Sequence, residues 1–173
     1  MDGKDFIQKK QITMGKPVIQ IQQGIQKISR EKLLKLYNPS NCIENSNKLK
    51  TIEDAIGSKA PSIGALQRDN GKKFTQGLVN VWLIYLNEML NLNKPMSESQ
   101  VKLCSGMILD EFYALKISDL TILFKRIISG EYGEFYERLS IDKVMSFFRK
   151  YFNERCVQAE ETNYRKHQEY KLD

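Results

Sequence analysis

Residues 72–90 read KKFTQGLVNVWLIYLNEML, and this stretch decides the fold class of the 173-residue chain. Its apolar residues recur at steps of three and four, which is the spacing along one face of an α-helix. They are Phe74, Leu78, Val81, Trp82, Tyr85, Leu86, Met89 and Leu90. We therefore predict a long helix that buries this face in a core and ends before Pro95.

Three further segments with the same period follow this helix. Ser97 and Gln100 have the spacing of a capping box at the start of the first segment. Gly130 has the position of a glycine that ends the second, and Ser140 the position of a residue that caps the third. The pattern predicts an all-α fold, a compact domain of about four main helices.

The first 60 residues lack this regularity. Residues 1–28 are rich in Gln and Lys, and they predict a loose arm with at most one short strand at 18–22. A short helix capped by Ser29 is expected to stop at Pro39, and the polar residues 40–50 to form a loop. We divide the chain into a basic N-terminal arm with short helices (1–60), a helical core domain (61–159) and a charged tail (160–173) that is helical or frayed.

The charge of the chain is uneven along its length. It has 27 Lys and Arg against 21 Asp and Glu, a formal net charge of +6. Residues 1–94 have a net charge of +7 and residues 95–173 one of −1. No apolar run approaches the roughly 18 to 20 residues of a membrane-spanning helix, and the first residues are polar. These features predict a cytoplasmic protein that does not bind membranes.

Lysines concentrated in the looser half could neutralise phosphates, which gives binding that is sensitive to salt and indifferent to sequence. Weak nucleic-acid-binding candidates are Lys9, Lys10, Lys27, Arg30, Lys32, Lys35, Lys72 and Lys73. Few aromatic residues lie among them, so stacking on single-stranded bases has little support. A basic surface without nucleic-acid contact, or one that binds an acidic protein, is the alternative interpretation.

The sequence lacks the residue patterns of common catalytic and metal sites. Gly71-Lys72-Lys73 does not complete a phosphate-binding loop, because Lys73 stands where the magnesium-binding hydroxyl should be. The single histidine, His167, lies in a polar segment, and the three cysteines are more than 50 residues apart. We therefore predict no catalytic residue, no metal and no cofactor, and a protein that is not an enzyme.

The segment 129–136, SGEYGEFY, connects two predicted helices with two glycines and three aromatic residues. In a structural interpretation, Gly130 and Gly133 take left-handed conformations and the aromatic residues pack the helices together. In a functional interpretation, the aromatic residues form an exposed ledge for a partner, with Tyr132 and Tyr136 as weak partner-binding candidates. The structural interpretation is favoured, since glycines between helices ordinarily serve that purpose.

Several matched stretches spread over residues 61–155 carry a resemblance to a known family. They are Trp82 with Leu86-Asn87-Glu88, Ile108-Leu109, 113–120 (YALKISDL), Phe124, 130–133 (GEYG), Tyr136, Leu139, Tyr151 and Glu154-Arg155. The chain resembles a family of helical proteins from Bacteroidota and their phages and mobile elements. The family implies no established activity, so no site residue is carried over from it, and the first 60 residues lie outside the resemblance.

The resemblance and the charge pattern together suggest a non-enzymatic interaction protein of a phage or mobile element in the cytoplasm of a bacterial host cell. It would act as a DNA-replication accessory, similar to a helicase loader, and contact a protein partner and nucleic acid. A structural or assembly protein of a phage particle is one alternative, and an inhibitor of host defence is another. The sequence leaves the oligomeric state open.

Overall fold

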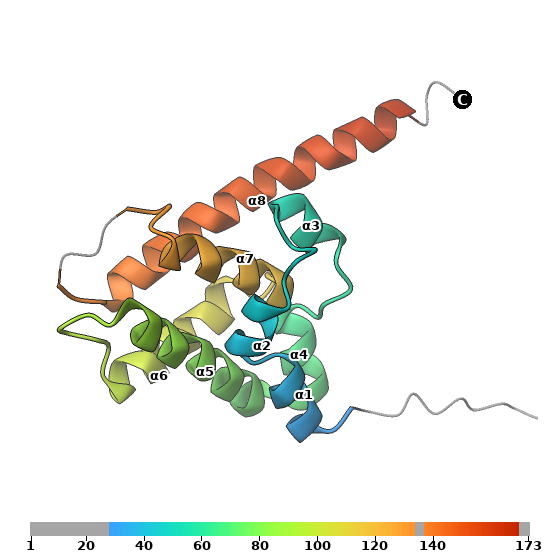
Figure 1. Cartoon of the computed structure of the whole chain (residues 1–173). Helices are drawn as coiled ribbons and strands as arrows, with labels where there is room; N and C mark the ends of the chain where they lie inside the picture. Colours follow the sequence, from blue (N-terminus) through green and yellow to red (C-terminus); the bar gives the residue numbers. More distant parts are fainter. Residues whose placement is uncertain (1–27, 134–136, 170–173) are drawn as a thin grey trace, which may run out of the picture.

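The structure, a computed structural model, describes residues 28–133 and 137–169 (Figure 1). Within these ranges the chain forms eight helices and no strand, which confirms the all-α fold class. The prediction of about four main helices is wrong in number. The helices are α1 (Arg30–Leu36), α2 (Pro39–Glu44), α3 (Ile52–Gly57), α4 (Ile63–Asn70), α5 (Lys72–Leu90), α6 (Glu98–Glu111), α7 (Ile117–Ile128) and α8 (Ile141–Glu169).

The segment predicted as a loop at 40–50 begins with a helix instead. Asn38 caps α2, because its side chain accepts a hydrogen bond from the Asn41 N–H at 2.9 Å. Pro39 stands at the first helical position, where a backbone N–H would have no partner within the helix, so the missing N–H does not destabilise α2. Pro39 therefore begins α2 and also prevents α1 from continuing. The predicted strand at 18–22 lies outside the described residues, and the division into three parts stays a prediction.

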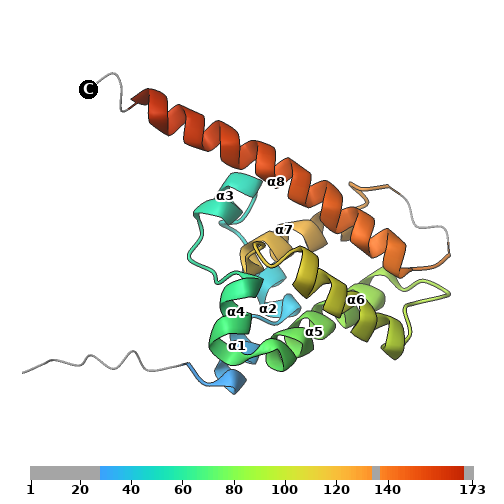
Figure 2. The ribbon, with the colours of Figure 1, turned by 180° about the vertical axis from the view of Figure 1, so that it is seen from behind.

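Helix α7 lies at the centre of the fold, with α8 on one side and α5 on the other (Figures 1 and 2). Most of its residues are buried, including its third residue, Asp119. Aromatic rings from three helices meet around it. The Phe124 ring lies edge-on to Trp82 at 5.0 Å and to Phe148 at 6.2 Å. The core is therefore one continuous cluster that reaches from α3 to α8.

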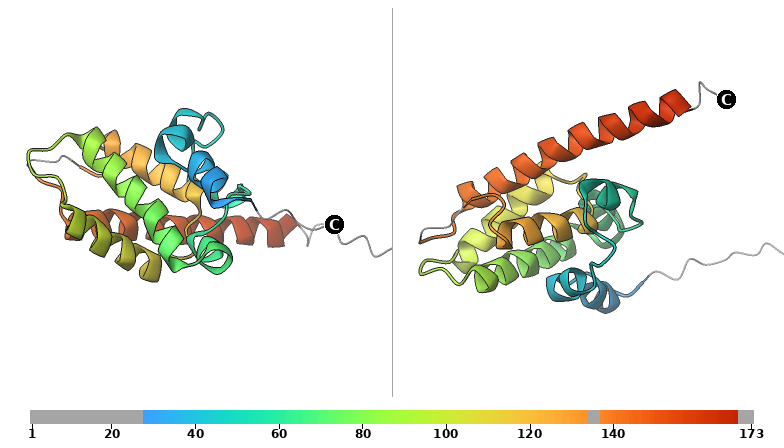
Figure 3. Two further views of the ribbon diagram at one scale, coloured as in Figure 1. Left: turned by 90° about the horizontal axis from the view of Figure 1, so that it is seen from below. Right: turned by 45° about the horizontal axis from the view of Figure 1, so that its top comes forward.

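Helix α5 spans the predicted residues, but two of the residues predicted to lie on its buried face are exposed to solvent. Val81 is 39% exposed and Met89 48% exposed, whereas Trp82 and Leu86 are fully buried. The neighbours α2, α4, α6 and α7 cover only part of the surface of α5. Figure 3, which looks at the molecule from below in its left panel, shows α5 with no other helix in front of it.

The connection after α7 uses the two glycines as the sequence predicts. Gly130 and Gly133 have φ angles of +80° and +103°, which side chains with a Cβ rarely adopt. Helix α8 then continues through Glu169 and projects beyond the other helices (Figure 1). Near its end, Arg165 pairs with Glu53 of α3 at 2.8 Å. None of the helices in the described ranges combines the length and apolar composition that spanning a bilayer requires.

Candidate nucleic-acid interface

Arg30 fixes the start of α1 against the junction of α4 and α5. Its guanidinium donates a hydrogen bond to the carbonyl oxygen of Asn70 at 2.9 Å and lies 5.7 Å from the centre of the Phe74 ring. Ser29 caps α1, since its Oγ accepts from the Lys32 N–H at 3.3 Å. Two segments that are 40 residues apart in sequence thus share one end of the molecule.

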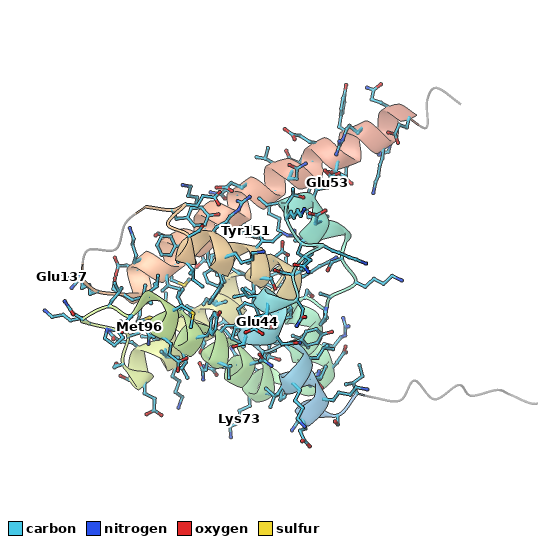
Figure 4. All side chains as sticks on the ribbon, viewed as in Figure 1. Glu44, Glu53, Lys73, Met96, Glu137 and Tyr151 are labelled. Atoms are coloured by element: carbon cyan, nitrogen blue, oxygen red, sulfur yellow. The ribbon has the colours of Figure 1, made fainter. Side chains whose placement is uncertain are left out.

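The first turn of α5 adds positive charge at the same end. Gly71 precedes it with a φ of +92°, and no side chain caps the free N–H groups of this turn. The Lys72 ammonium pairs with Asp110 of α6 at 2.8 Å. Lys73 is exposed, and its side chain points away from the body of the molecule (Figure 4).

The basic end, as we call this surface, carries more cations than carboxylates. Its cations are Arg30, Lys32, Lys35, Arg68, Lys72 and Lys73. Three of them have exposed ion pairs, with Glu31, Asp69 and Asp110, which leaves a net charge of about +3. Within the described ranges, Lys32 and Lys73 have no ion pair.

Five of the eight nucleic-acid-binding candidates from the sequence therefore lie on α1 and on the first turn of α5. The remaining three, Lys9, Lys10 and Lys27, lie outside the described residues. The cations of α1 lie beside those of α5 because Arg30 contacts Asn70 and Phe74, on either side of the start of α5. No sequence pattern indicates this contact, because it joins two helices that are distant in the chain.

Tyr132 packs within the connection between α7 and α8. Its ring stacks on Phe147 at 5.8 Å, and the Lys150 ammonium lies 4.7 Å from the ring centre. The Arg126 guanidinium donates to its hydroxyl at 3.4 Å, and partial burial raises the pKa of Tyr132. Tyr136 lies outside the described residues. A partner-binding role for either tyrosine stays a prediction.

A buried ion pair joins α7 and α8, and none of the candidate residues predicted from the sequence belongs to it. Asp119 is fully buried, and the Arg155 Nε–H donates to both of its carboxylate oxygens in one bifurcated hydrogen bond, at 3.0 Å from each oxygen. The Tyr151 hydroxyl and the backbone N–H of Lys116 also donate to it, at 2.9 and 2.8 Å. Burial, together with the nearby Asp119 charge, raises the pKa of Tyr151, so its hydroxyl stays protonated and remains a donor.

A pocket of about 310 Å³ lies between residues 49–50 and α7, beside Arg126. Most of its polar groups already have partners. Arg126 pairs with Glu154 at 2.7 Å and with Glu131 at 3.5 Å, and Lys125 donates to Ser46 Oγ at 2.8 Å. Because these bonds tie the last turn of α7 to its neighbours, the arrangement indicates a structural role.

The described residues contain no cluster of three or more His, Cys, Asp or Glu side chains that could hold a metal ion. Burial raises the pKa of the Cys104 thiol to about 12 and that of Cys42 to about 11, so both thiols stay protonated at neutral pH. His167 is exposed in the last turn of α8.

Comparisons with models of protein families, with curated proteins and with solved structures found no match to this chain. The resemblance noted above therefore stays a prediction.

Proposed function

We propose that the chain is a non-enzymatic interaction protein of a phage or mobile element that contacts nucleic-acid phosphates with its basic end. A process such as DNA replication, in which a small accessory protein holds nucleic acid and a larger protein together, fits this role. The observation that supports the proposal is the contact of Arg30 with Asn70 and Phe74, which sets the cations of α1 beside those of α5.

Phosphate binding by such a surface follows from counterion release. Each cation that neutralises a phosphate frees a condensed counterion, so affinity falls steeply as the salt concentration rises. Lys32 and Lys73 need to break no ion pair in the described chain to make this contact. The pairs of Lys35 and Lys72 are exposed, and exposed pairs contribute about 0 to 1 kcal/mol, so phosphates can replace their carboxylates.

Lys32→Glu tests the proposal, with Lys166→Glu as its control. Both variants change the charge equally, but Lys166 lies in the last turn of α8, whose end is remote from α1 (Figure 1). We expect Lys32→Glu to weaken binding to a fluorescent DNA duplex. The salt slope, which is the slope of the logarithm of the binding constant against the logarithm of the salt concentration, should fall in magnitude by about 1. Equal binding and equal slopes in the two variants would contradict the proposal.

The protein partner is tested by affinity capture from cells that carry the phage or element. Recovery of a helicase or primase is the expected result. Recovery of portal or capsid proteins would instead support the alternative of a particle-assembly protein, and it would contradict the replication role. DNA binding by the purified chain is a separate measurement, so the two parts of the proposal can fail independently.

A further inference from the structure

Five exposed residues form a stripe along α5, which we call the α5 stripe. At 100° per residue they fall within an arc of about 80°, so they share one face of the helix. The stripe consists of Lys73, Gly77, Val81, Ile84 and Glu88. Val81 and Ile84 are 39% and 47% exposed. Because Val81 and Ile84 are three residues apart on this face, their exposed apolar surfaces adjoin.

Gly77 is the unusual member of the stripe. It lies in the interior of a 19-residue helix, where glycine is less stable than alanine. A Cβ atom built at this position meets no heavy atom within 4 Å, and its φ angle is not in the left-handed region. Neither packing within the described chain nor backbone conformation therefore requires a glycine here. A glycine does permit the close approach of a second molecule.

The order of residues in the stripe is complementary to itself when it is reversed. A cation stands at one end and a carboxylate at the other, with a glycine and an isoleucine between them on opposite sides of Val81. In an antiparallel pair, Lys73 lies opposite Glu88, and Gly77 opposite Ile84, because both pairs of positions are centred near residue 81. Self-complementarity of this kind is what a two-fold symmetric interface requires.

We propose that the α5 stripe binds the α5 stripe of a second copy of this chain, with the two helices antiparallel. The Ile84 side chain of each copy fills the space above Gly77 of the other, and the two Val81 side chains meet near the two-fold axis. Lys73 and Glu88 form two equivalent intermolecular ion pairs. Neither has an ion pair within the described chain, so both are available.

The neighbouring helix α6 lies beside the stripe and carries a further exposed apolar residue. Ile84 and Lys102 line the same pocket between α5 and α6, and Leu103, the next residue, is 59% exposed. A face built around one helix is small for a protein interface, so we expect a reversible dimer that forms over about 1 to 100 μM. The dimer forms without nucleic acid, and because Lys73 pairs with Glu88 in it, the other cations of the basic end would make the phosphate contacts. The dimer would carry two basic ends about 20 Å or more apart.

Charge reversal at the ends of the stripe tests the proposal by sedimentation velocity over this concentration range. Lys73→Glu sets two carboxylates opposite each other, and Glu88→Lys sets two ammonium groups opposite each other, so each variant is expected to be monomeric. An equimolar mixture of the two variants restores both ion pairs and is expected to form a heterodimer. Lys166→Glu, the control for charge, is expected to dimerise like the unaltered chain.

Gly77→Gln gives a second, independent readout. Glutamine is the better helix former and has open space within the monomer, so the melting temperature of dilute protein should rise. The same side chain blocks Ile84 of the second copy, so the dimer should be lost. An unaltered chain that stays monomeric up to 100 μM, a mixture that does not associate, or a Gly77→Gln variant that dimerises normally would each overturn the proposal.

Discussion

Asp119 joins the start of α7 to α8 through one buried carboxylate. It caps the first turn of α7 through the Lys116 N–H, and it accepts hydrogen bonds from Tyr151 and Arg155 of α8. The Arg155 side chain is only 15% exposed, so its largely buried positive charge needs the Asp119 carboxylate as a counter-charge. The pair therefore fixes how α8 lies on α7, and with it the position of the connection that contains Tyr132.

Asp119→Asn should destabilise the fold by about 3 to 5 kcal/mol, since it leaves a largely buried guanidinium without a counter-charge. Glu111→Gln makes the same chemical change in an exposed pair, Glu111 with Arg149 at 2.8 Å, and should cost less than about 1 kcal/mol. Urea unfolding followed by circular dichroism measures both. Similar decreases in the free energy of unfolding of the two variants would show that burial of the Asp119 pair does not increase its contribution to stability.

Among the elements, the connection between α1 and α2 receives a hydrogen bond from α5. The indole N–H of Trp82 donates to the carbonyl oxygen of Tyr37 at 3.0 Å, and the indole ring lies fully buried against Phe124. Helices of six or seven residues are not stable alone, so α1 and α2 need such contacts to persist. This link also holds the cations of α1 in place.

Trp82→Phe should therefore loosen α1 and α2 more than the rest of the fold. The substitution leaves the Tyr37 carbonyl without its donor and opens a small cavity, at a cost of about 2 to 3 kcal/mol. We expect faster hydrogen exchange at amides 30–44 under native conditions, with smaller changes in α7 and α8. Met89→Leu, at a half-exposed position of the same helix, is the control. Uniform acceleration across all helices would contradict the local role of this bond.

At the scale of the whole molecule, positive charge gathers at one end. The basic end lies at the start of α1 and α5, whereas α8 projects from the other side of the core with charges of both signs (Figure 1). The net charge of +7 in residues 1–94 includes residues 1–27, which carry five lysines and two aspartates. The first 27 residues join the described chain two residues before Arg30.

Removal of residues 1–28 should reduce the salt slope of DNA binding, because it takes away Lys9, Lys10, Lys27 and two further lysines. The described helices all start at or after Arg30, so the truncated chain keeps them, and circular dichroism checks this. Fluorescence anisotropy between about 50 and 200 mM salt gives the slope. An unchanged slope would show that the phosphate contacts come from the basic end alone.

The features that depend only on neighbours in the chain can be predicted from the amino-acid sequence. The period of apolar residues predicts the helices from position 72 onward, and the capping box at Ser97 forms as its spacing predicts. The left-handed glycines Gly130 and Gly133 follow from the same local physics. Each of these features needs only a few consecutive residues to form its hydrogen bonds or to satisfy its backbone angles.

The packing of the helices sets which parts of each helix are covered and which distant side chains meet. Periodicity places Val81 on the apolar side of α5, but the neighbouring helices leave it exposed. The contact of Arg30 with Asn70 and the ion pair of Asp119 with Arg155 join residues about 40 positions apart. Such contacts depend on how the helices pack in space, and no short-range pattern in the sequence encodes that packing.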